Sequence, residues 1–284
     1  MSSPPVLSER PAVLRRAAAR PSPWRSNVNL TRELAVTTFK LKYTGSVLGY
    51  AWSLFKPLLI FGTTYLVFAV FLHVGRGSPA ENFPVELLLG IVVWTFFAEA
   101  TATSTASVVA NGRILSKAYF PRWILVVAST LSVTMTLSVN MVLILAVGLP
   151  LGWFHVGLYT LVLPLLFVEL YVLVAGIGLL LSALYVFYRD IAHVWEILLQ
   201  ILFYGSAVVF PFSLIPARYK TLIAFNPMAQ IIEDMRRALV SQVVPWSSQV
   251  LGPLLIVPIA AVLVIFCLGF IIFTRRSSRF AEAL

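Results

Sequence analysis

Apolar residues run along this chain in six long blocks, separated by shorter segments that carry most of its charge. Each block approaches or exceeds the roughly 20 apolar helical residues needed to cross a bilayer core about 30 Å thick. The pattern therefore predicts an all-α polytopic membrane protein with six transmembrane helices. The predicted spans are residues 57–74, 87–110, 123–150, 157–187, 191–211 and 251–273.

Two kinds of sequence precede the first span. Residues 1–28 are rich in Pro and Arg, and they predict a disordered basic tail without the apolar core of a cleavable signal peptide. Residues 29–56 place Glu33 early and Lys40 and Lys42 later, which is the order that the helix dipole favours. With several aromatic residues, this order predicts a helix lying in the cytoplasmic interface. A simple juxtamembrane anchor is the alternative.

The segment 212–250 is too long for a tight connection and too polar to span. Asn226 suits the N-cap of a helix whose first residue is Pro227. Two half-helices, 217–225 and 227–240, predict an outer re-entrant helical hairpin, with a helix resting on the bilayer as the alternative. The second half-helix has an apolar stripe (Met228, Ile231, Ile232, Met235, Leu239) opposite a polar one (Glu233, Asp234, Arg236, Arg237).

Charged residues make up only 11% of the chain, against about 25% in an ordinary soluble domain. With the N-terminus in the cytoplasm, the inner segments hold 16 Lys and Arg residues and the outer segments hold 5. The positive-inside rule therefore predicts that both termini are cytoplasmic, flanking a transmembrane domain at 57–274 and ending in a tail at 275–284. The net charge of +10 lies beside apolar spans, so it indicates membrane lipids as partners and no nucleic acid.

Polar residues alternate strictly between Thr130 and Asn140. Period two is the strand signature, but an isolated strand in lipid would leave its backbone groups unsatisfied, so a helix is predicted. Two residues turn a helix by about 200°, which divides these positions into two nearly opposite stripes. Either neighbours or a pore flank both stripes, or the hydroxyls bond to carbonyls of their own helix. The stripes are Thr130, Thr134 and Ser138, and Ser132, Thr136 and Asn140.

No residue pattern supports catalysis. The chain lacks GxxxxGK[ST] and GxGxxG, so any ATP that drives it must bind to another chain. Its three histidines are far apart and predict no metal site, and its sole cysteine, Cys267, excludes an intramolecular disulfide. We therefore expect a transport subunit that is not an enzyme and holds no cofactor.

Two carboxylates, Glu99 and Glu169, fall inside predicted spans. A charge at bilayer depth costs about 2.5–3.5 kcal/mol or more, so such residues usually face protein or water. Either they line a water-filled translocation path, or they are protonated and hydrogen-bonded in a helix interface.

Motifs spread in order over about residues 30–275 point to one family. Those before the first span are Arg32-Glu33-Leu34, Phe39-Lys40-Leu41-Lys42-Tyr43, Ser46-Val47-Leu48-Gly49-Tyr50-Ala51-Trp52 and Lys56-Pro57-Leu58; the others are Asn111 to Arg122, Tyr188-Arg189-Asp190-Ile191 and Asn226-Pro227-Met228. Together they resemble the membrane permeases of polysaccharide ABC exporters, which move O-antigen, teichoic acid or related lipid-linked glycans. Thr44 stands where that family usually has a basic residue.

The resemblance implies a homodimer with two ATP-binding subunits in the bacterial inner membrane. ATP and Mg would bind to those subunits, and a polyprenyl-linked polysaccharide would pass between the protomers. The candidate substrate path is Trp94, Phe97, Glu99, Glu169 and Tyr171. The candidate ATPase-coupling residues are Arg32, Glu33, Arg113, Lys117, Tyr119, Arg122, Arg189 and Asp190. The candidate outer gate is Tyr219, Asn226, Pro227, Ile231 and Ile232.

Two other functions remain open from the sequence. Glu99 and Glu169 are compatible with an ion-coupled secondary transporter, although such carriers favour two repeated halves and no internal repeat is visible. A membrane-embedded glycosyl or phosphoglycosyl transferase would need acidic residues clustered at the membrane face, and only Asp190 with Glu196 comes near.

Overall fold

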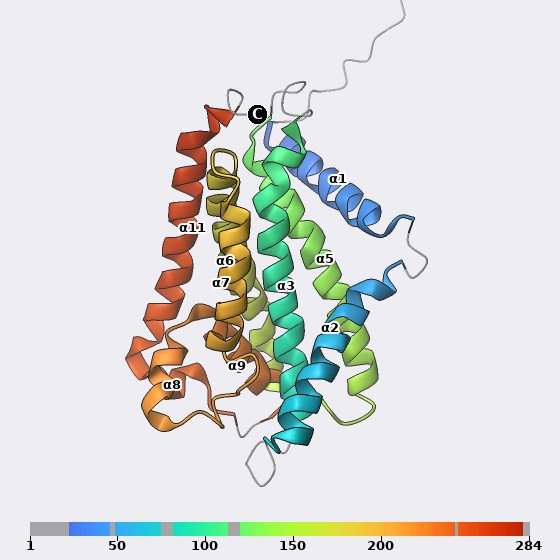
Figure 1. Cartoon of the computed structure of the whole chain (residues 1–284), viewed down its shortest axis with the longest axis vertical. Coiled ribbons are helices and arrows are strands. Elements are labelled where there is room, and N and C mark those ends of the chain that lie inside the picture. The colour runs from blue at the N-terminus through green and yellow to red at the C-terminus, as the bar shows by residue number, and fades with distance from the viewer. Residues whose placement is uncertain (1–22, 46–48, 75–81, 113–119, 242–243, 281–284) are drawn as a thin grey trace, which may run out of the picture.

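The computed structural model describes residues 23–45, 49–74, 82–112, 120–241 and 244–280. Every regular element in these ranges is a helix (Figure 1). In chain order they are α1 (Pro23–Tyr43), α2 (Ala51–Tyr65), the π-helical turn η1 (Leu66–Phe71), α3 (Phe83–Ala110), α5 (Trp123–Gly148), the short helix η2 (Leu158–Val162), α6 (Leu163–Tyr185), α7 (Ile191–Gly205), α8 (Ala217–Ala224), α9 (Pro227–Leu239), α10 (Ser247–Leu251), η3 (Gly252–Leu255) and α11 (Ile256–Ser277).

Five helical stretches in the described ranges are long and apolar enough to cross a membrane, which confirms the all-α multi-pass class. They are Ala51–Phe71, Phe83–Ala110, Trp123–Gly148, Leu158–Tyr185 and Ser247–Ser277. The fifth predicted span, 191–211, is helical only to Gly205.

α7 has 15 residues and thus a length of about 22 Å, short of the roughly 30 Å bilayer core. The helix stops where Ala207 adopts a left-handed backbone with φ of 54°, which an α-helix cannot contain. Five long spans and one short apolar helix are therefore what the structure supports, and the exact count of six is not confirmed.

α1 begins at Pro23, six residues before the predicted start. Proline suits the first turn of a helix, since its missing N–H would have no partner there. The helix therefore includes the last part of the segment predicted as a disordered tail. Residues 1–22 lie outside the described residues.

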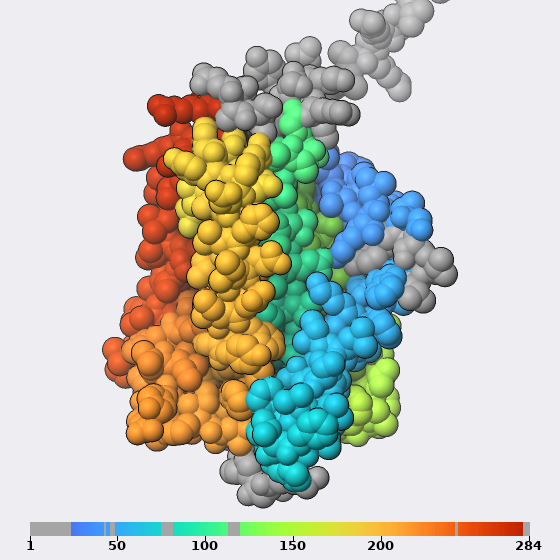
Figure 2. Space-filling model, in the orientation of Figure 1, coloured from blue at the N-terminus to red at the C-terminus, as the bar shows by residue number. Residues whose placement is uncertain are grey.

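α3 lies at the centre of the bundle and packs against α2, α5, α6 and α7. α6 makes its most extensive contact with α11, where an added Cβ on Gly176 would lie 2.6 Å from the Cα of Phe266. Small residues let two helix backbones approach this closely. Figure 2 shows α2 lying across the surface, with α3 visible between α2 and α7.

The bundle has two distinct ends (Figure 1). One end, called here the α1 end, holds the start of α1, the end of α3, the starts of α5 and α7 and the end of α11. The opposite end, called the α9 end, holds α8, α9 and the start of α3.

α8 and α9 lie where the two half-helices are predicted. The Asn226 side chain accepts a hydrogen bond from the Met228 N–H at 3.0 Å, which confirms the predicted N-cap. The polar stripe of α9 is not on the surface, since Glu233, Asp234 and Arg236 are buried together with the apolar stripe. α9 is therefore packed inside the protein on both faces, and membrane re-entry of the hairpin stays a prediction.

Candidate functional site: the groove between α2 and α3

A groove of about 640 Å³ opens between the end of α1, the start of α2 and the middle of α3. This volume lies within the roughly 300–1,000 Å³ range of small-molecule sites. The lining combines two lysines and one glutamate with apolar and hydroxyl groups. The lining residues are Lys42, Trp52, Ser53, Lys56, Leu59, Ile60, Thr95 and Glu99.

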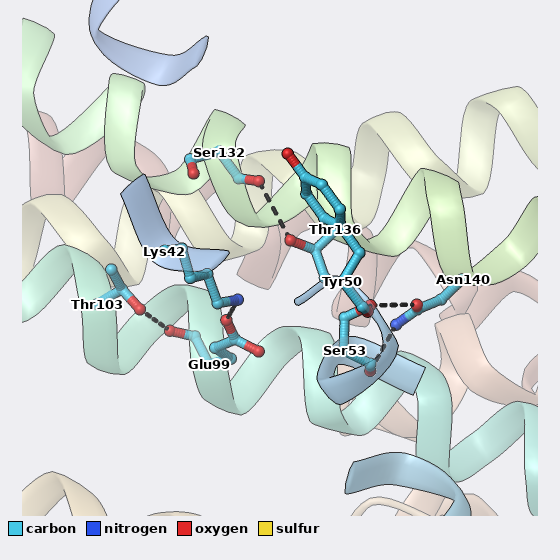
Figure 3. A network of polar contacts seen from close by, with 8 residues as sticks. All are labelled: Lys42, Tyr50, Ser53, Glu99, Thr103, Ser132, Thr136 and Asn140. Atoms are coloured by element: carbon cyan, nitrogen blue, oxygen red, sulfur yellow. Dashed lines mark hydrogen bonds and ion pairs between the residues drawn. The ribbon is translucent and has the colours of Figure 1, made fainter. Parts of the chain in front are cut away.

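An ion pair joins Lys42 at the end of α1 to Glu99 in α3 (Figure 3). The two side chains retain 33% and 22% of their exposure. A pair this accessible contributes only about 0–1 kcal/mol to stability. A competing anion can therefore replace the carboxylate with only a small loss of free energy. With Lys56 in the same lining, the groove carries a net positive charge.

Two hydrogen bonds between Ser53 and Asn140 connect the α2 wall of the groove to α5 (Figure 3). The Asn140 side-chain amide donates to the Ser53 carbonyl at 3.0 Å, and the Ser53 hydroxyl lies 3.0 Å from the Asn140 side-chain oxygen. That hydroxyl also lies 2.8 Å from the Tyr50 carbonyl, so its single proton is shared between two acceptors.

The alternating polar residues of α5 use their hydrogen bonds in two ways. Thr134 and Ser138 each donate to the carbonyl four residues earlier, at 2.9 and 3.0 Å. Thr136 does the same at 3.5 Å. These hydroxyls satisfy their own helix, as the second interpretation predicts. Asn140 reaches across to α2, and Thr130 reaches 3.4 Å to the Tyr171 hydroxyl of α6.

A second, largely apolar cavity of about 300 Å³ lies between α3, α5 and α6. Tyr171 lines it together with Thr134, Ser138 and Phe167. The hydroxyls on one side and the rings on the other make it amphipathic, but it is separate from the groove.

Trp94 and Phe97 point away from the groove and are buried. Their rings lie 5.3 Å apart, Trp94 contacts Phe203 of α7 at 5.8 Å, and Phe97 lies 6.3 Å from Trp195. The Trp195 indole N–H also donates to the Thr101 hydroxyl at 3.0 Å. This aromatic group therefore fastens α7 to α3.

Glu169 lies toward the α9 end, in a polar cluster between α6 and α9. The Gln230 amide is 3.4 Å from a Glu169 oxygen and 3.0 Å from an Asp234 oxygen. The Ser247 N–H donates to Asp234 at 2.8 Å. Burial raises the pKa of Asp234, while the hydrogen bonds from Gln230 and Ser247 lower it.

A fully buried arginine connects α9 to α3. Arg236 donates to the carbonyls of Glu86, Ala207 and Val208 at 2.9, 2.7 and 2.6 Å. It also donates to Glu233 at 2.5 Å. Glu86 is buried as well, and neither of its carboxyl oxygens has a hydrogen-bond partner in the described chain. Two carboxyls thus accompany one guanidinium, and a single negative charge suffices to balance it.

Basic residues gather at the α1 end. Arg122 lies over the ring of Phe280 at 5.9 Å, Arg189 over Tyr185 at 5.1 Å, and Arg276 over Phe187 at 5.7 Å. Asp190 precedes α7. Arg32 and Glu33 are exposed on α1. Arg113, Lys117 and Tyr119 lie outside the described residues.

Comparison with known proteins identifies the fold family. Residues 29–240 match the ABC-2 type transporters over most of the chain. The chain belongs to the ABC-2 type transporter family.

Relatives of this ABC-2 transporter have defined cargoes. It is 27% identical to the O-antigen export system permease protein RfbA of Klebsiella pneumoniae, covering 86% of this chain and 91% of the relative. A Myxococcus xanthus protein with the same description is 25% identical over the same shares. The polysialic acid transport protein KpsM of Escherichia coli is 27% identical, covering 67% of this chain and 73% of the relative.

The predicted path residues of this ABC-2 transporter do not share one surface. Glu99 lies in the groove, Tyr171 in the second cavity and Glu169 in the polar cluster, while Trp94 and Phe97 are in the core. Their role in the path stays a prediction.

Among the predicted gate residues, Ile231 and Ile232 are fully buried and Tyr219 is exposed beneath Arg218. Asn226 and Pro227 form the start of α9, which places these five residues at the α9 end. Their gating role stays a prediction.

Sequence reasoning missed the groove lysine Lys56 and the buried partners Glu86 and Arg236. Lys56 stands in a motif before the first span, yet its position opposite Glu99 depends on how α2 folds back over α3. Glu86 falls one residue before the predicted second span, so it looked like a loop residue. No local signal distinguishes Arg236 from its neighbour Arg237.

Proposed function

We propose that this chain is the membrane permease subunit of an ATP-driven exporter of a lipid-linked polysaccharide. The observation that carries the proposal is the likeness to O-antigen and polysialic acid transport proteins over at least two thirds of this chain. Membership of the ABC-2 family favours this function over the secondary transporter and the transferase.

The assembly that we propose is a homodimer with two ATP-binding subunits in the bacterial inner membrane, with both chain termini in the cytoplasm. In support, 6% of the apolar stretch of Ala51–Phe71 is buried in the single chain, which leaves a long face for lipid or a second copy. The chain has no nucleotide-binding motif, so ATP and Mg would bind to the partner.

The groove suits the lipid-linked end of such a substrate. Lys42 and Lys56 supply positive charge for its phosphate groups, Leu59 and Ile60 supply apolar surface for its lipid, and Trp52 offers a ring to a sugar. Glu99 forms an ion pair with Lys42. When the substrate binds, its phosphate would displace this carboxylate from Lys42.

Vesicles containing the chain and its ATP-binding partner test the proposed function. ATP should drive glycan movement, and an uncoupler that collapses the proton gradient at constant ATP should leave the rate unchanged. Transport that stops on addition of the uncoupler would instead support an ion-coupled carrier.

The α1 end is our candidate for contact with the ATP-binding subunit. Arg189→Glu should reduce coupled ATP hydrolysis and export, because it reverses a charge on that surface. The matched control is Arg218→Glu, an exposed arginine over a tyrosine ring at the opposite end. If the two changes have equal effects, the α1 end does not form the coupling interface.

A further inference from the structure

Adjacent arginines of α9 have opposite surroundings. Arg236 is fully buried and bonded to Glu233 and three carbonyls. Arg237 is half-buried, and no carboxylate lies within ion-pair distance of it in the described part of the chain. Its Nε is buried without a hydrogen-bond partner. A buried N–H without an acceptor costs free energy, so this half-buried guanidinium calls for an anionic acceptor supplied from elsewhere.

Arg237 lines a cavity of about 200 Å³ at the α9 end. Its walls are the connection that leads into η2 and the C-terminal end of α9. Three contacts fix these walls together: the His155 backbone N–H donates to the Leu239 carbonyl at 2.8 Å, the His155 Nδ1 lies 3.2 Å from the Val240 carbonyl, and the Thr160 hydroxyl donates to the Ala238 carbonyl at 3.5 Å. The cavity is therefore preformed, which lowers the entropic penalty of binding.

An aromatic side chain supports the arginine in the cavity. The Arg237 guanidinium lies over the Tyr159 ring at 5.7 Å, and Tyr159 meets the edge of Trp246 at 5.6 Å. A guanidinium carries paired N–H donors, which match a two-oxygen acceptor such as phosphate.

The surroundings of the cavity indicate where that anion comes from. Leu158, Leu161, Leu165 and Val168 are all more than half exposed, at 83%, 77%, 68% and 58%. Their spacing of three, four and three residues places them on one face of η2 and α6. This apolar ridge leads from the membrane span to the cavity, and Tyr and Trp beside it are the residues that prefer the membrane–water interface.

We propose that this cavity binds the phosphate group of a membrane lipid whose chains lie along the Leu158–Val168 ridge. The guanidinium supplies charge and paired hydrogen bonds, Tyr159 lies beside the phosphate ester in the cavity lining, and the ridge holds the acyl chains. A volume near 200 Å³ fits one headgroup, below the roughly 300–1,000 Å³ of sites that enclose larger ligands.

The test measures binding of short-chain phosphatidylglycerol to the purified full-length chain in neutral detergent. Arg237→Gln should weaken binding about tenfold or more, since a hydrogen bond to a charged group is lost. Arg237→Lys should keep part of the affinity, because it keeps the charge but not the planar pair of donors. Arg218→Gln is the matched control: it also removes a cation from a tyrosine ring at the α9 end, but outside the cavity, and it should leave binding unchanged.

Three further probes separate the sources of the anion. Diacylglycerol of the same chain length should bind far more weakly, because it lacks phosphate. If a short polyprenyl phosphate binds in place of phosphatidylglycerol, and if Arg237→Gln weakens that binding, the phosphate site belongs to the carrier lipid. If glucuronate binds to the cavity and neither phosphate lipid does, the proposal is overturned in favour of an acidic-sugar site.

Folding is checked separately from binding. The thermal unfolding midpoint without lipid should be the same in Arg237→Gln and the wild type. If Arg237→Gln does not fold, Tyr159→Leu keeps the guanidinium and removes its aromatic support, and it should weaken binding by a smaller factor. Unchanged phosphatidylglycerol affinity in a folded Arg237→Gln or Tyr159→Leu protein would overturn the proposal.

Discussion

The segment Ala51–Phe71 (α2 with η1) and α3 have nearly the same mean hydropathy, 1.8 and 1.7, but opposite surroundings. In the apolar stretch of α3, 78% of the residues are buried inside the chain, against 6% in Ala51–Phe71. Hydropathy therefore predicts compatibility with the bilayer, and it says nothing about which apolar helix packs against protein. The difference separates a fixed part of the molecule from a lightly attached one.

The fixed part is built around α3. Arg236 fastens it to α9, and the rings of Trp94 and Phe97 fasten it to α7. The lightly attached part is α2, which packs against α3 and is joined to α5 by a pair of hydrogen bonds between Ser53 and Asn140. We infer that α2 is the wall that moves when the groove opens, while α3 and α9 move as one body.

Removal of Arg236 should have the largest effect. Deleting one partner of a buried ion pair typically costs about 3–5 kcal/mol, and Arg236 also satisfies three buried carbonyls. We expect Arg236→Gln to lower the unfolding midpoint strongly or to prevent isolation of a monodisperse protein. Arg237→Gln, one residue away, should leave the midpoint nearly unchanged. Equal midpoints for the two variants would refute the fixed attachment of α9.

Two glycine substitutions compare the helices directly. An added Cβ on Gly90 of α3 would lie 2.5 Å from an Arg236 nitrogen and 2.9 Å from the Val208 carbonyl, whereas Gly62 of α2 has nothing within 4 Å. Gly90→Ala should therefore destabilise by about 1–3 kcal/mol through overpacking. Gly62→Ala should be neutral or stabilise by up to about 1 kcal/mol, because alanine is the better helix former. Chemical unfolding in detergent measures both.

Stability should also depend on pH through Glu233. Burial raises the pKa of Glu233 to about 7, while the Arg236 charge lowers it and the Glu86 carboxyl raises it. The folded pKa of Glu233 lies above its usual value of 4.5, so the protonated carboxyl contributes to the stability of the folded state. This contribution is complete below about pH 4.5 and is lost as the pH rises through 7. The unfolding midpoint should be lower at pH 8 than at pH 6, and Glu233→Gln should reduce this difference. Glu33→Gln, on exposed α1, should leave it unchanged.

The ion pair of Lys42 with Glu99 should have the smallest effect on stability. A partly exposed pair is worth about 0–1 kcal/mol, so Glu99→Gln should barely shift the unfolding midpoint. Export should fall modestly, since glutamine keeps the size and much of the hydrogen bonding. Loss of all transport together with its dependence on a proton gradient would indicate that Glu99 carries protons.

Much of the fold could be predicted from run lengths and local signals. The apolar blocks located the helices, and Asn226 with Pro227 located the start of α9. The end of α7 could not be predicted, because apolar residues continue through Ala207, Val208 and Val209 after the backbone has left the helix. One residue with a left-handed backbone, Ala207, ends the helix without any change in hydropathy.

The candidate site was predicted less well, because its members meet only in three dimensions. Glu99 was singled out for its charge, but its partner Lys42 lies 57 residues away. Trp94 and Phe97 were candidates for the substrate path, yet aromatic rings are equally suited to packing against Trp195 and Phe203. Residue type alone cannot separate these uses.

Movement of α2 is tested most directly by cross-linking it in place. After Cys267→Ser, cysteines at Ser53 and Asn140 would join α2 to α5, and a control pair at Thr160 and Ala238 would join η2 to α9. With a short thiol cross-linker, the first pair should stop ATP-driven glycan export in vesicles and the control pair should not. Export that continues at the wild-type rate with α2 fully cross-linked would contradict the account.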